Sequence, residues 1–257
     1  MISVIMPVFN SDQYLAEAIE SILDQTYRDF EFLIMNDGST DNSLKIIKKY
    51  ALIDQRIHFW THSNKGVTVT LNDLLKESHH DLIARMDADD ISLPERFAKQ
   101  VEFLDKNPDY VAIGCKVQTI DPAGRPLGQW CDKQTHEAIE EILINPFNAG
   151  VTVIAHSGVM YRRKSVFAIG DYNESIKQSQ DLDLWLRLIE NGGKLANLPD
   201  TLLKVRLHND SSCHRYFENM WKAGQIAVRN SRQRRGLPEL PFVEPDKCFL
   251  LDQGKNV

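Results

Sequence analysis

The sequence predicts a single large α/β domain with a mainly parallel central sheet, Rossmann-like helices on both faces and a C-terminal helical extension. Apolar runs of strand length alternate with apolar residues at helical spacing through residues 1–115, a rhythm typical of parallel sheets. The length of 257 residues allows one large domain with an appendage. We expect residues 1–210 to form the domain and residues 211–257 to form a helical extension and tail.

Local patterns justify each element of the first half. Residues 2–8 form an apolar run that predicts a buried strand, and further strands are expected at residues 30–35, 56–60 and 81–86. Apolar residues at helical spacing predict helices at residues 11–23, 39–50, 68–77 and 94–105. Ser11 is expected to cap the first helix, one residue among Ser39, Thr40 and Asp41 the second, and Pro94 to start the fourth.

The rhythm becomes irregular from about residue 120. Short strands are expected at residues 127–130, 159–161 and 201–207, and helices at residues 136–144, 181–191 and 216–235. The stretch from Pro238 is poorly patterned, and we expect part of it to lack fixed structure.

Composition limits the class of function. The net charge of −6 argues against nucleic acid as the main partner, because phosphate binding needs a basic face. The four cysteines are widely spaced without a C-x-x-C pair, which predicts reduced thiols rather than disulfides or a zinc site. The N-terminus lacks a basic region and no apolar stretch reaches about 18 residues, so we expect a cytoplasmic protein without signal peptide or membrane span.

The strongest chemical signal is Asp87-Ala88-Asp89-Asp90, directly after the fourth predicted strand. Three carboxylates this close repel one another unless a cation or hydrogen-bond donors neutralise them. Oxygen ligands suit a hard cation such as Mg²⁺ or Mn²⁺, held together with substrate phosphates. An acidic loop before the helix at Pro94 would explain the same residues without a metal, but a position after an apolar strand favours the metal.

A second carboxylate, Asp37, follows the second predicted strand within Asn36-Asp37-Gly38-Ser39. Parallel sheets bind ligands at the carboxyl ends of their strands, and a carboxylate beside glycine can face a ligand at close range. Taken alone, however, this motif is explained better by a turn with a helix cap.

Longer motifs occur in a fixed order: S-V-I-M-P-V-F-N, S-I-L-D-Q-T-Y, F-E-F-L-I-M-N-D-G-S-T-D, I-A-R-M-D-A-D-D-I-S-L-P-E-R-F, H-S-G-V-M-Y-R-R, Q-D-L-D-L-W-L-R-L and V-R-L-H-N-D-S-S. As a set they resemble family-2 inverting glycosyltransferases of the GT-A fold, over roughly residues 1–215. The chain looks most like bacterial enzymes that extend lipopolysaccharide or capsule oligosaccharides. The resemblance implies a nucleotide-binding half at residues 1–115 and an acceptor-binding half at residues 116–210.

The resemblance assigns the donor-binding residues by position. Asp37 matches the family's carboxylate that accepts a hydrogen bond from the base, which favours uracil because its N3 carries a proton. Asp87 matches the first residue of the family's D-x-D motif, near the ribose or around the metal. Pro7, Val8 and Asn10 lie on the loop that lines the nucleoside pocket.

The resemblance also implies a metal and a base. Asp89 matches the direct ligand of Mn²⁺ or Mg²⁺, and His208 matches a histidine that reaches the metal or the diphosphate. Arg206 either does the same or is a solvated charge at a strand end. Asp181 matches the general base, which takes the proton from the acceptor hydroxyl. One base and no intervening nucleophile mean inversion at the anomeric carbon.

The implied reaction moves a sugar of the Gal, GlcNAc, GalNAc or Glc type from UDP to a hydroxyl of a saccharide or glycolipid acceptor, in bacterial surface polysaccharide synthesis. The metal stabilises the leaving diphosphate. Asn36 and Gln180 depart from the family pattern, which often has Asp and Glu there. Neither removes a proposed catalytic atom, although Gln180 leaves the acceptor side less defined.

Three other classes compete with this interpretation. A nucleotidyltransferase needs a Gly-rich, basic phosphate loop after the first strand, and residues 7–14 contain no Gly, Lys or Arg. A phosphatase with an Asp nucleophile carries its D-x-D motif after the first strand, not the fourth. A catalytically inactive sugar- or nucleotide-binding module is disfavoured by the joint presence of Asp37, Asp89 and Asp181.

Two further clusters have open interpretations. Cys213-His214 could join His208 in a zinc site, although a four-ligand set is missing. A basic cluster is formed by Arg229, Arg232, Arg234 and Arg235. It is either solvated helix surface or a docking site for anionic lipid or an acidic glycolipid, which would hold the protein peripherally at the inner face of the membrane.

Overall fold

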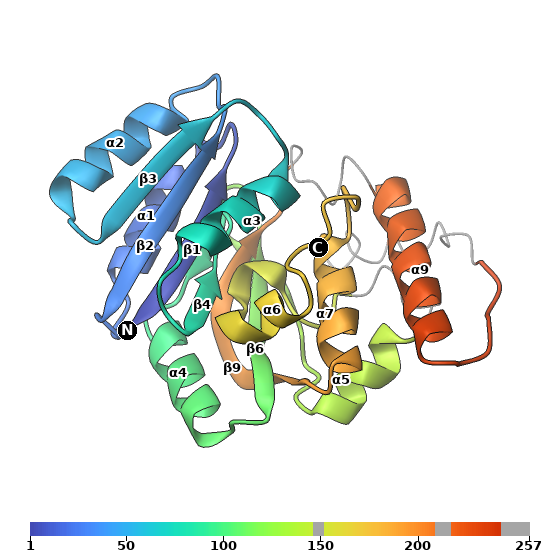
Figure 1. Cartoon of the computed structure of the whole chain (residues 1–257). Coiled ribbons are helices and arrows are strands. Elements are labelled where there is room, and N and C mark those ends of the chain that lie inside the picture. The colour runs from blue at the N-terminus through green and yellow to red at the C-terminus, as the bar shows by residue number, and fades with distance from the viewer. Residues whose placement is uncertain (146–151, 209–216, 243–257) are drawn as a thin grey trace.

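The computed structural model of the chain describes residues 1–145, 152–208 and 217–242 (Figure 1). Its strands are β1 (Ile2–Val8), β2 (Phe30–Asp37), β3 (Ile57–His62), β4 (Leu82–Arg85), β5 (Ile91–Ser92), β6 (Tyr110–Ile120), β7 (Pro126–Trp130), β8 (Met160–Arg162) and β9 (Lys194–Arg206). Its helices are α1 (Leu15–Leu23), α2 (Ser43–Ile53), α3 (Val67–Glu77), α4 (Arg96–Lys106), α5 (His136–Leu143), the short η2 (His156–Gly158), α6 (Arg163–Ala168), α7 (Gln180–Glu190) and α9 (Phe217–Arg234).

The strands form one sheet in the order β3-β2-β1-β4-β8-β6-β9-β5, and β7 pairs with β6 beside this path. The first four strands are parallel to one another. β8 runs antiparallel between β4 and β6, whereas β6 and β9 are again parallel. The predicted mainly parallel α/β sheet is therefore confirmed, with β5, β7 and β8 as its antiparallel members.

Helices cover both faces of the sheet because consecutive strand residues point to opposite sides. In β1, Val4 and Met6 lie in one core with residues of α1, α2 and α4, whereas Ile5 lies in a second core with residues of α3, α5 and α7. Ala227 and Val228 of α9 belong to the second core, and Figure 1 shows α9 beside α7. The C-terminal helix thus packs on the sheet-bearing body, and a domain boundary at residue 210 stays a prediction.

The starts of three helices differ from the expected caps. α1 begins at Leu15 without a side-chain cap: the Ser11 hydroxyl donates to the Phe9 carbonyl at 3.1 Å and accepts no helix N–H. α2 begins at Ser43, whose N–H donates to the Asp41 carboxylate at 2.9 Å, so Asp41 is the one of three candidates that contacts the helix start. α4 begins at Arg96, after Pro94 rather than at it.

Periodicity missed β5, β6, α6 and the first half of β9. β5 and α6 are short, and β6 contains Gly114 and Cys115 where bulky strand-forming residues are usual. Close packing explains the small residue, because a Cβ added at Gly114 would lie 2.1 Å from the Asn197 side-chain oxygen of β9. Gly114 and Cys115 therefore interrupt a strand that otherwise contains typical strand-forming residues, Val111, Ile113 and Val117 among them.

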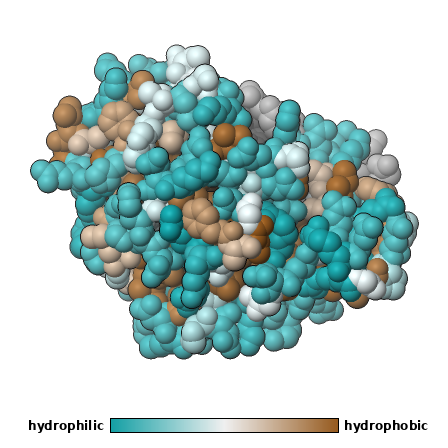
Figure 2. Space-filling model, in the orientation of Figure 1, coloured by the Kyte–Doolittle hydropathy of each residue, from teal (hydrophilic) through white to brown (hydrophobic). Residues whose placement is uncertain are grey.

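A membrane-spanning helix must be long and predominantly apolar. Figure 2 shows a mostly hydrophilic face on which hydrophobic residues occur in small groups. None of the helices in the described ranges is long and apolar enough to cross a membrane.

Candidate functional site

Four strand ends meet at one edge of the sheet. β1 ends at Val8, β2 at Asp37, β4 at Arg85 and β9 at Arg206, and all four strands run in the same direction. Ligands of parallel sheets bind at this edge. Apart from Asp181, every predicted site residue lies at or just after one of these ends.

The loop after β1 is held to the loop after β2. Asn10, in the left-handed region at φ 46°, accepts the Thr40 N–H at 2.8 Å, and its own N–H donates to the Ser39 hydroxyl at 3.0 Å. Val8 is buried in the core, and Pro7 is partly buried, so a contact of either residue with a nucleoside stays a prediction.

Asp37 is buried at the end of β2, with 3% of its surface exposed. Its two carboxylate oxygens accept backbone N–H groups from the loop after β3, Lys65 at 2.7 Å and Gly66 at 3.0 Å. The imidazole Nδ1 of His62 lies 3.3 Å from one of them. A carboxylate has about four lone-pair directions, so it can still accept a donor from a ligand.

Gly38 allows the loops after β2 and β3 to approach each other. Its φ is 71°, in the left-handed region, and an added Cβ would lie 2.6 Å from the Asn64 nitrogen. Both observations require glycine here. The turn that was expected from Asn36-Asp37-Gly38-Ser39 is present, and it brings the loop after β3 to the Asp37 carboxylate.

The acidic loop after β4 brings three carboxylates together. Single oxygens of Asp87, Asp89 and Asp90 lie within 4.8 Å of one another. Asp87 is paired with the buried Arg85 and its N–H donates to the Ser157 hydroxyl at 3.0 Å. Asp90 is 3% exposed and accepts the Arg206 N–H at 2.9 Å. Burial raises the pKa of Asp90 well above its usual range, and the charges of Asp89 and Asp87 raise it further.

Asp89 is the member of this loop that faces a possible metal ligand from another strand end. Its carboxylate lies 2.9 Å from Nε2 of His208, and both side chains are partly exposed. Adjacent ligands of an octahedral ion bound at about 2.1 Å lie roughly 3 Å apart. The pair therefore fits a shared divalent ion, and carboxylate with imidazole is a donor set that Mn²⁺ accepts.

Arg206, predicted to bind the donor or to be solvated, is buried, with 3% of its side chain exposed. Its Nε donates to the Asp89 carbonyl at 3.2 Å, Nη1 donates to the Pro122 carbonyl at 3.1 Å, and Nη2 forms an ion pair with Glu17. The solvated alternative is therefore wrong for this residue. A direct contact between Arg206 and the donor stays a prediction.

Asp181 lies in the first turn of α7, after Ser179, whose φ of 58° marks the turn into the helix. The Asp181 charge contributes to raising the pKa of Asp87, so the two carboxylates are near enough to interact electrostatically. Burial raises the pKa of Asp181, while the Leu182 N–H and the Arg85 cation oppose this shift. A carboxylate with a raised pKa in such surroundings is a better proton acceptor than a solvated one.

Sequence reasoning missed three parts of this region. Phe9, between Val8 and Asn10, is 49% exposed on the β1 loop. Arg85 is buried and pairs with Asp87. Because it lies inside a predicted strand, the sequence did not indicate that this cation belongs to the site. His156 of η2 bonds through Nε2 to the Tyr172 hydroxyl at 2.7 Å. Burial lowers the pKa of His156 well below its usual range, and Arg85 lowers it further.

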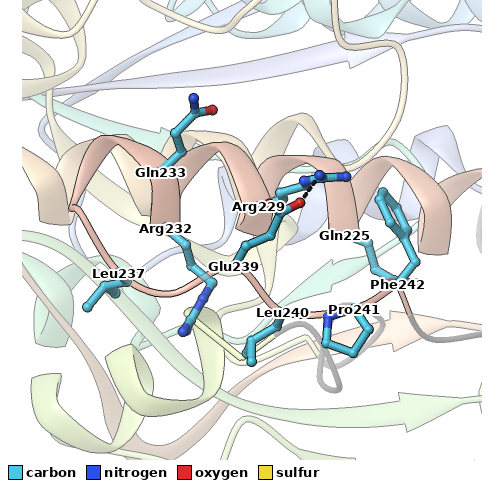
Figure 3. Close-up of a pocket in the computed structure, with 9 residues that line it drawn as sticks. All are labelled: Gln225, Arg229, Arg232, Gln233, Leu237, Glu239, Leu240, Pro241 and Phe242. Atoms are coloured by element: carbon cyan, nitrogen blue, oxygen red, sulfur yellow. Dashed lines mark ion pairs between the residues drawn. The ribbon is translucent and has the colours of Figure 1, made fainter.

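The basic cluster on α9 is engaged within the chain. Arg234 pairs with Glu190, Arg235 with Glu140, and Arg232 donates to the Ile144 carbonyl at 3.0 Å. Arg229 pairs with Glu239 across a hollow of about 220 Å³ between α9 and residues 237–242 (Figure 3). None of the predicted donor, metal or base residues lines this hollow. Cys213 and His214 lie outside the described residues.

Sequence comparison identifies the class to which this fold and site belong. The profile described as "Glycosyl transferase family 2" matches residues 3–169. The "O-antigen biosynthesis glycosyltransferase WbnJ" of Escherichia coli is 34% identical over 215 residues, which cover 82% of this chain and 82% of WbnJ.

Two solved structures share the fold. S. aureus TarS 1-349 in complex with UDP-GlcNAc superposes with a TM-score of 0.71 at 19% identity, over 90% of this chain and 66% of that chain. The mannosyltransferase PcManGT from Pyrobaculum calidifontis, in complex with GDP-Man and Mn²⁺, gives a TM-score of 0.64 at 15% identity, over 99% of this chain and 79% of that chain.

The architecture is therefore that of the GT-A glycosyltransferases. The chain belongs to glycosyltransferase family 2.

Proposed function

We propose that this chain is an inverting, metal-dependent hexosyltransferase that moves a sugar from a UDP-sugar to a hydroxyl of a saccharide or glycolipid acceptor. The observation that carries the proposal is the meeting of Asp89, His208 and Asp87 at one sheet edge, with Asp181 electrostatically coupled to Asp87. Family membership restricts the chemistry to glycosyl transfer. WbnJ, an O-antigen biosynthesis enzyme by name, supports a role in bacterial surface polysaccharide synthesis.

The donor is a nucleotide sugar held along the edge formed by β1, β2 and β4. The complexes of TarS with UDP-GlcNAc and of PcManGT with GDP-Man support this ligand class. Asp37 accepts the N3 proton of uracil, Asp87 lies at the ribose, and Pro7, Val8 and Asn10 line the nucleoside pocket. We expect a sugar of the Gal, GlcNAc, GalNAc or Glc type.

Asp89 and His208 hold Mn²⁺ or Mg²⁺. When bound, the ion neutralises charge on the leaving diphosphate. The Mn²⁺ in the PcManGT complex supports a divalent metal in an enzyme of this fold. Arg85 neutralises Asp87, and Asp90 is turned toward the Arg206 N–H, which leaves Asp89 as the carboxylate available to a cation.

Asp181 acts as the general base on the acceptor hydroxyl. Burial raises the pKa of Asp181, which strengthens its affinity for that proton, while the Arg85 cation opposes this rise. Attack from the side opposite the diphosphate inverts the anomeric configuration, so an α-linked donor gives a β-linked product.

Contact with a membrane would involve the basic cluster on and next to α9. The arginines of the cluster already pair with Glu190, Glu140 and Glu239. Anionic lipid would have to compete with these ion pairs. Lack of cosedimentation with anionic vesicles at low salt would contradict this part alone.

The decisive experiment measures UDP release from a panel of UDP-sugars with Mn²⁺ and a saccharide acceptor, for the wild type and Asp181→Asn. Loss of a positioned base slows the chemical step by about 10²–10⁴-fold, roughly 3–5.5 kcal/mol of barrier. Donor affinity should stay within about threefold, because Asp181 contacts the acceptor and not the nucleotide.

Asp183→Asn is the matched control on the same helix. Asp183 is buried and accepts from Arg187 at 2.7 Å, so the substitution should lower stability without removing the base. A folded Asp181→Asn protein with near-normal transfer would exclude the base. UDP-sugar binding without turnover in the wild type would instead favour an inactive binding module.

A further inference from the structure

Arg206 is a buried cation beside the site, and its guanidinium binds protein groups. Only 3% of its side chain is exposed, and each guanidinium nitrogen has a protein acceptor. A guanidinium so engaged has little freedom to turn toward a diphosphate. We therefore consider the protein groups that Arg206 binds.

Two of these groups belong to the acidic loop. The Arg206 backbone N–H donates to the Asp90 carboxylate at 2.9 Å, and its Nε donates to the Asp89 carbonyl at 3.2 Å. The strand pairing of β5 with β9 continues the same link, since Ile91 is opposite Lys204. The backbone that carries the Asp89 carboxylate is thus fixed to the end of β9.

The other groups belong to α1 and to the turn after β6. Nη2 pairs with Glu17 of α1, and Nη1 donates to the Pro122 carbonyl. The guanidinium carbon lies 4.5 Å from the centre of the Tyr14 ring, and that ring lies 5.3 Å from the His208 ring. Tyr14 is therefore packed between Arg206 and the imidazole that faces Asp89.

We infer that Arg206 is a positioning residue for the metal site, which fixes the Asp89 backbone directly and the His208 ring through Tyr14. This inference rests on the proposed function, in which Asp89 and His208 are ligands. It differs from the predicted contact between Arg206 and the donor, because in this role Arg206 acts through the protein groups that it binds.

The planar, five-donor guanidinium suits this role. It donates in several fixed directions at once and stacks on an aromatic ring, whereas an ammonium is a point charge on a flexible stem. Lysine could reach Glu17 or a carbonyl but not hold all of these groups. Arg206→Lys should therefore lie between the wild type and Arg206→Gln.

The test is Mn²⁺ binding in the presence of UDP, followed by calorimetry and by the electron paramagnetic resonance signal of free Mn²⁺, below the melting temperature of each variant. Loss of an outer group that orients metal ligands typically weakens metal affinity by about 10–100-fold. We expect a weakening in this range for Arg206→Gln and a smaller one for Glu17→Gln, whose carboxylate is 55% exposed.

Arg162→Gln controls for the loss of a structural arginine, although Arg162 is only partly buried. Arg162 also donates to several backbone carbonyls, those of Tyr110 and Leu104 at 2.9 and 2.7 Å among them, but it contacts α4 and β6 rather than the acidic loop. It should lower the melting temperature while leaving the Mn²⁺ dissociation constant within about twofold.

The outcomes separate the two hypotheses. A wild-type protein that binds no Mn²⁺ would overturn the proposed metal site itself. Wild-type Mn²⁺ binding with an unchanged dissociation constant in folded Arg206→Gln would overturn the positioning role alone. If Arg206→Gln does not fold, unchanged Mn²⁺ binding in both Arg206→Lys and Glu17→Gln overturns the inference.

Discussion

The ends of β2 and β4 both carry carboxylates, but their charge is balanced in different ways. At the end of β2, Asp37 receives two backbone N–H groups from the next loop. At the end of β4, Arg85 pairs with Asp87 and one N–H of Arg206 binds Asp90, among three crowded carboxylates. Asp37 is a single carboxylate whose two oxygens are bound by backbone N–H groups. In the group after β4, by contrast, the Asp89 carboxylate faces His208.

This difference separates two kinds of recognition. A single carboxylate fixed by backbone donors keeps its position whether or not a ligand is present, which suits reading the hydrogen-bond pattern of a base. Crowded carboxylates in a partly buried loop are stabilised by an added cation. The β4 end should therefore depend on metal, and the β2 end should not.

The largest effect is expected at the β4 end. Asp89→Ala should abolish the part of UDP affinity that depends on Mn²⁺, because metal stabilisation of phosphate charge amounts to several kcal/mol. Calorimetry with UDP, with and without Mn²⁺, measures it. Asp132→Ala, at a largely exposed carboxylate, is the control. Equal affinities for wild type and Asp89→Ala in both conditions would remove the distinction between the two strand ends.

A smaller effect is expected at the β2 end. Asp37→Ala should weaken UDP binding by about 1.5–3 kcal/mol, the size of a hydrogen bond to a charged group, with or without Mn²⁺. Wild type should prefer UDP to CDP, and Asp37→Asn should narrow that preference, since an amide can also donate to cytosine N3.

Asp54→Ala is the matched control for Asp37. Asp54 also accepts a backbone N–H in its own loop, from Arg56 at 3.0 Å, but it lies at the start of β3 rather than at the ligand edge. It should cost stability and leave UDP affinity unchanged. An Asp37→Ala protein that binds UDP normally would show that Asp37 only closes the turn.

The smallest effect is expected for the electrostatic interaction between the β4 end and Asp181. A base must be ionised to act, and burial raises the pKa of Asp181, so kcat should fall on acidification at a higher pH than for an ordinary aspartate. Arg85, Asp87 and Tyr172 interact electrostatically with Asp181. Arg85→Gln removes the cation that lowers this pKa and should move the acid limb to higher pH. If the acid limb of the normalised kcat profile does not move in Arg85→Gln, Arg85 does not influence the pKa of the base.

Sequence patterns predicted the first four strands because each is rich in apolar residues, and β1 is an almost continuous apolar run, as burial on both faces of a parallel sheet demands. They failed at β6, whose Gly114 makes room for Asn197 on a strand far along the chain. Strand propensity describes a residue's own preference, and here packing against a distant partner decided the residue.

The candidate site shows a similar limit. Asp89 and His208 were paired by resemblance to a family and not by spacing, since 119 residues separate them. Arg206 was taken for a ligand-binding or solvated charge because its partners, Glu17 and the Asp89 carbonyl, cannot be seen from its neighbours in sequence. Buried arginines are recognised from the acceptors around them, which only the tertiary structure supplies.

The links made by Arg206 set an order of events during biosynthesis. Arg206 provides both the N–H that binds Asp90 and the cation that pairs with Glu17. It is synthesised 116 residues after Asp90 and 189 residues after Glu17. A nascent chain that has emerged only to the end of β6 carries the whole acidic loop but neither Arg206 nor His208. Contacts of such long sequence separation are slow to form. The growing polypeptide should therefore acquire affinity for divalent ions only after β9 has left the ribosome, late in translation.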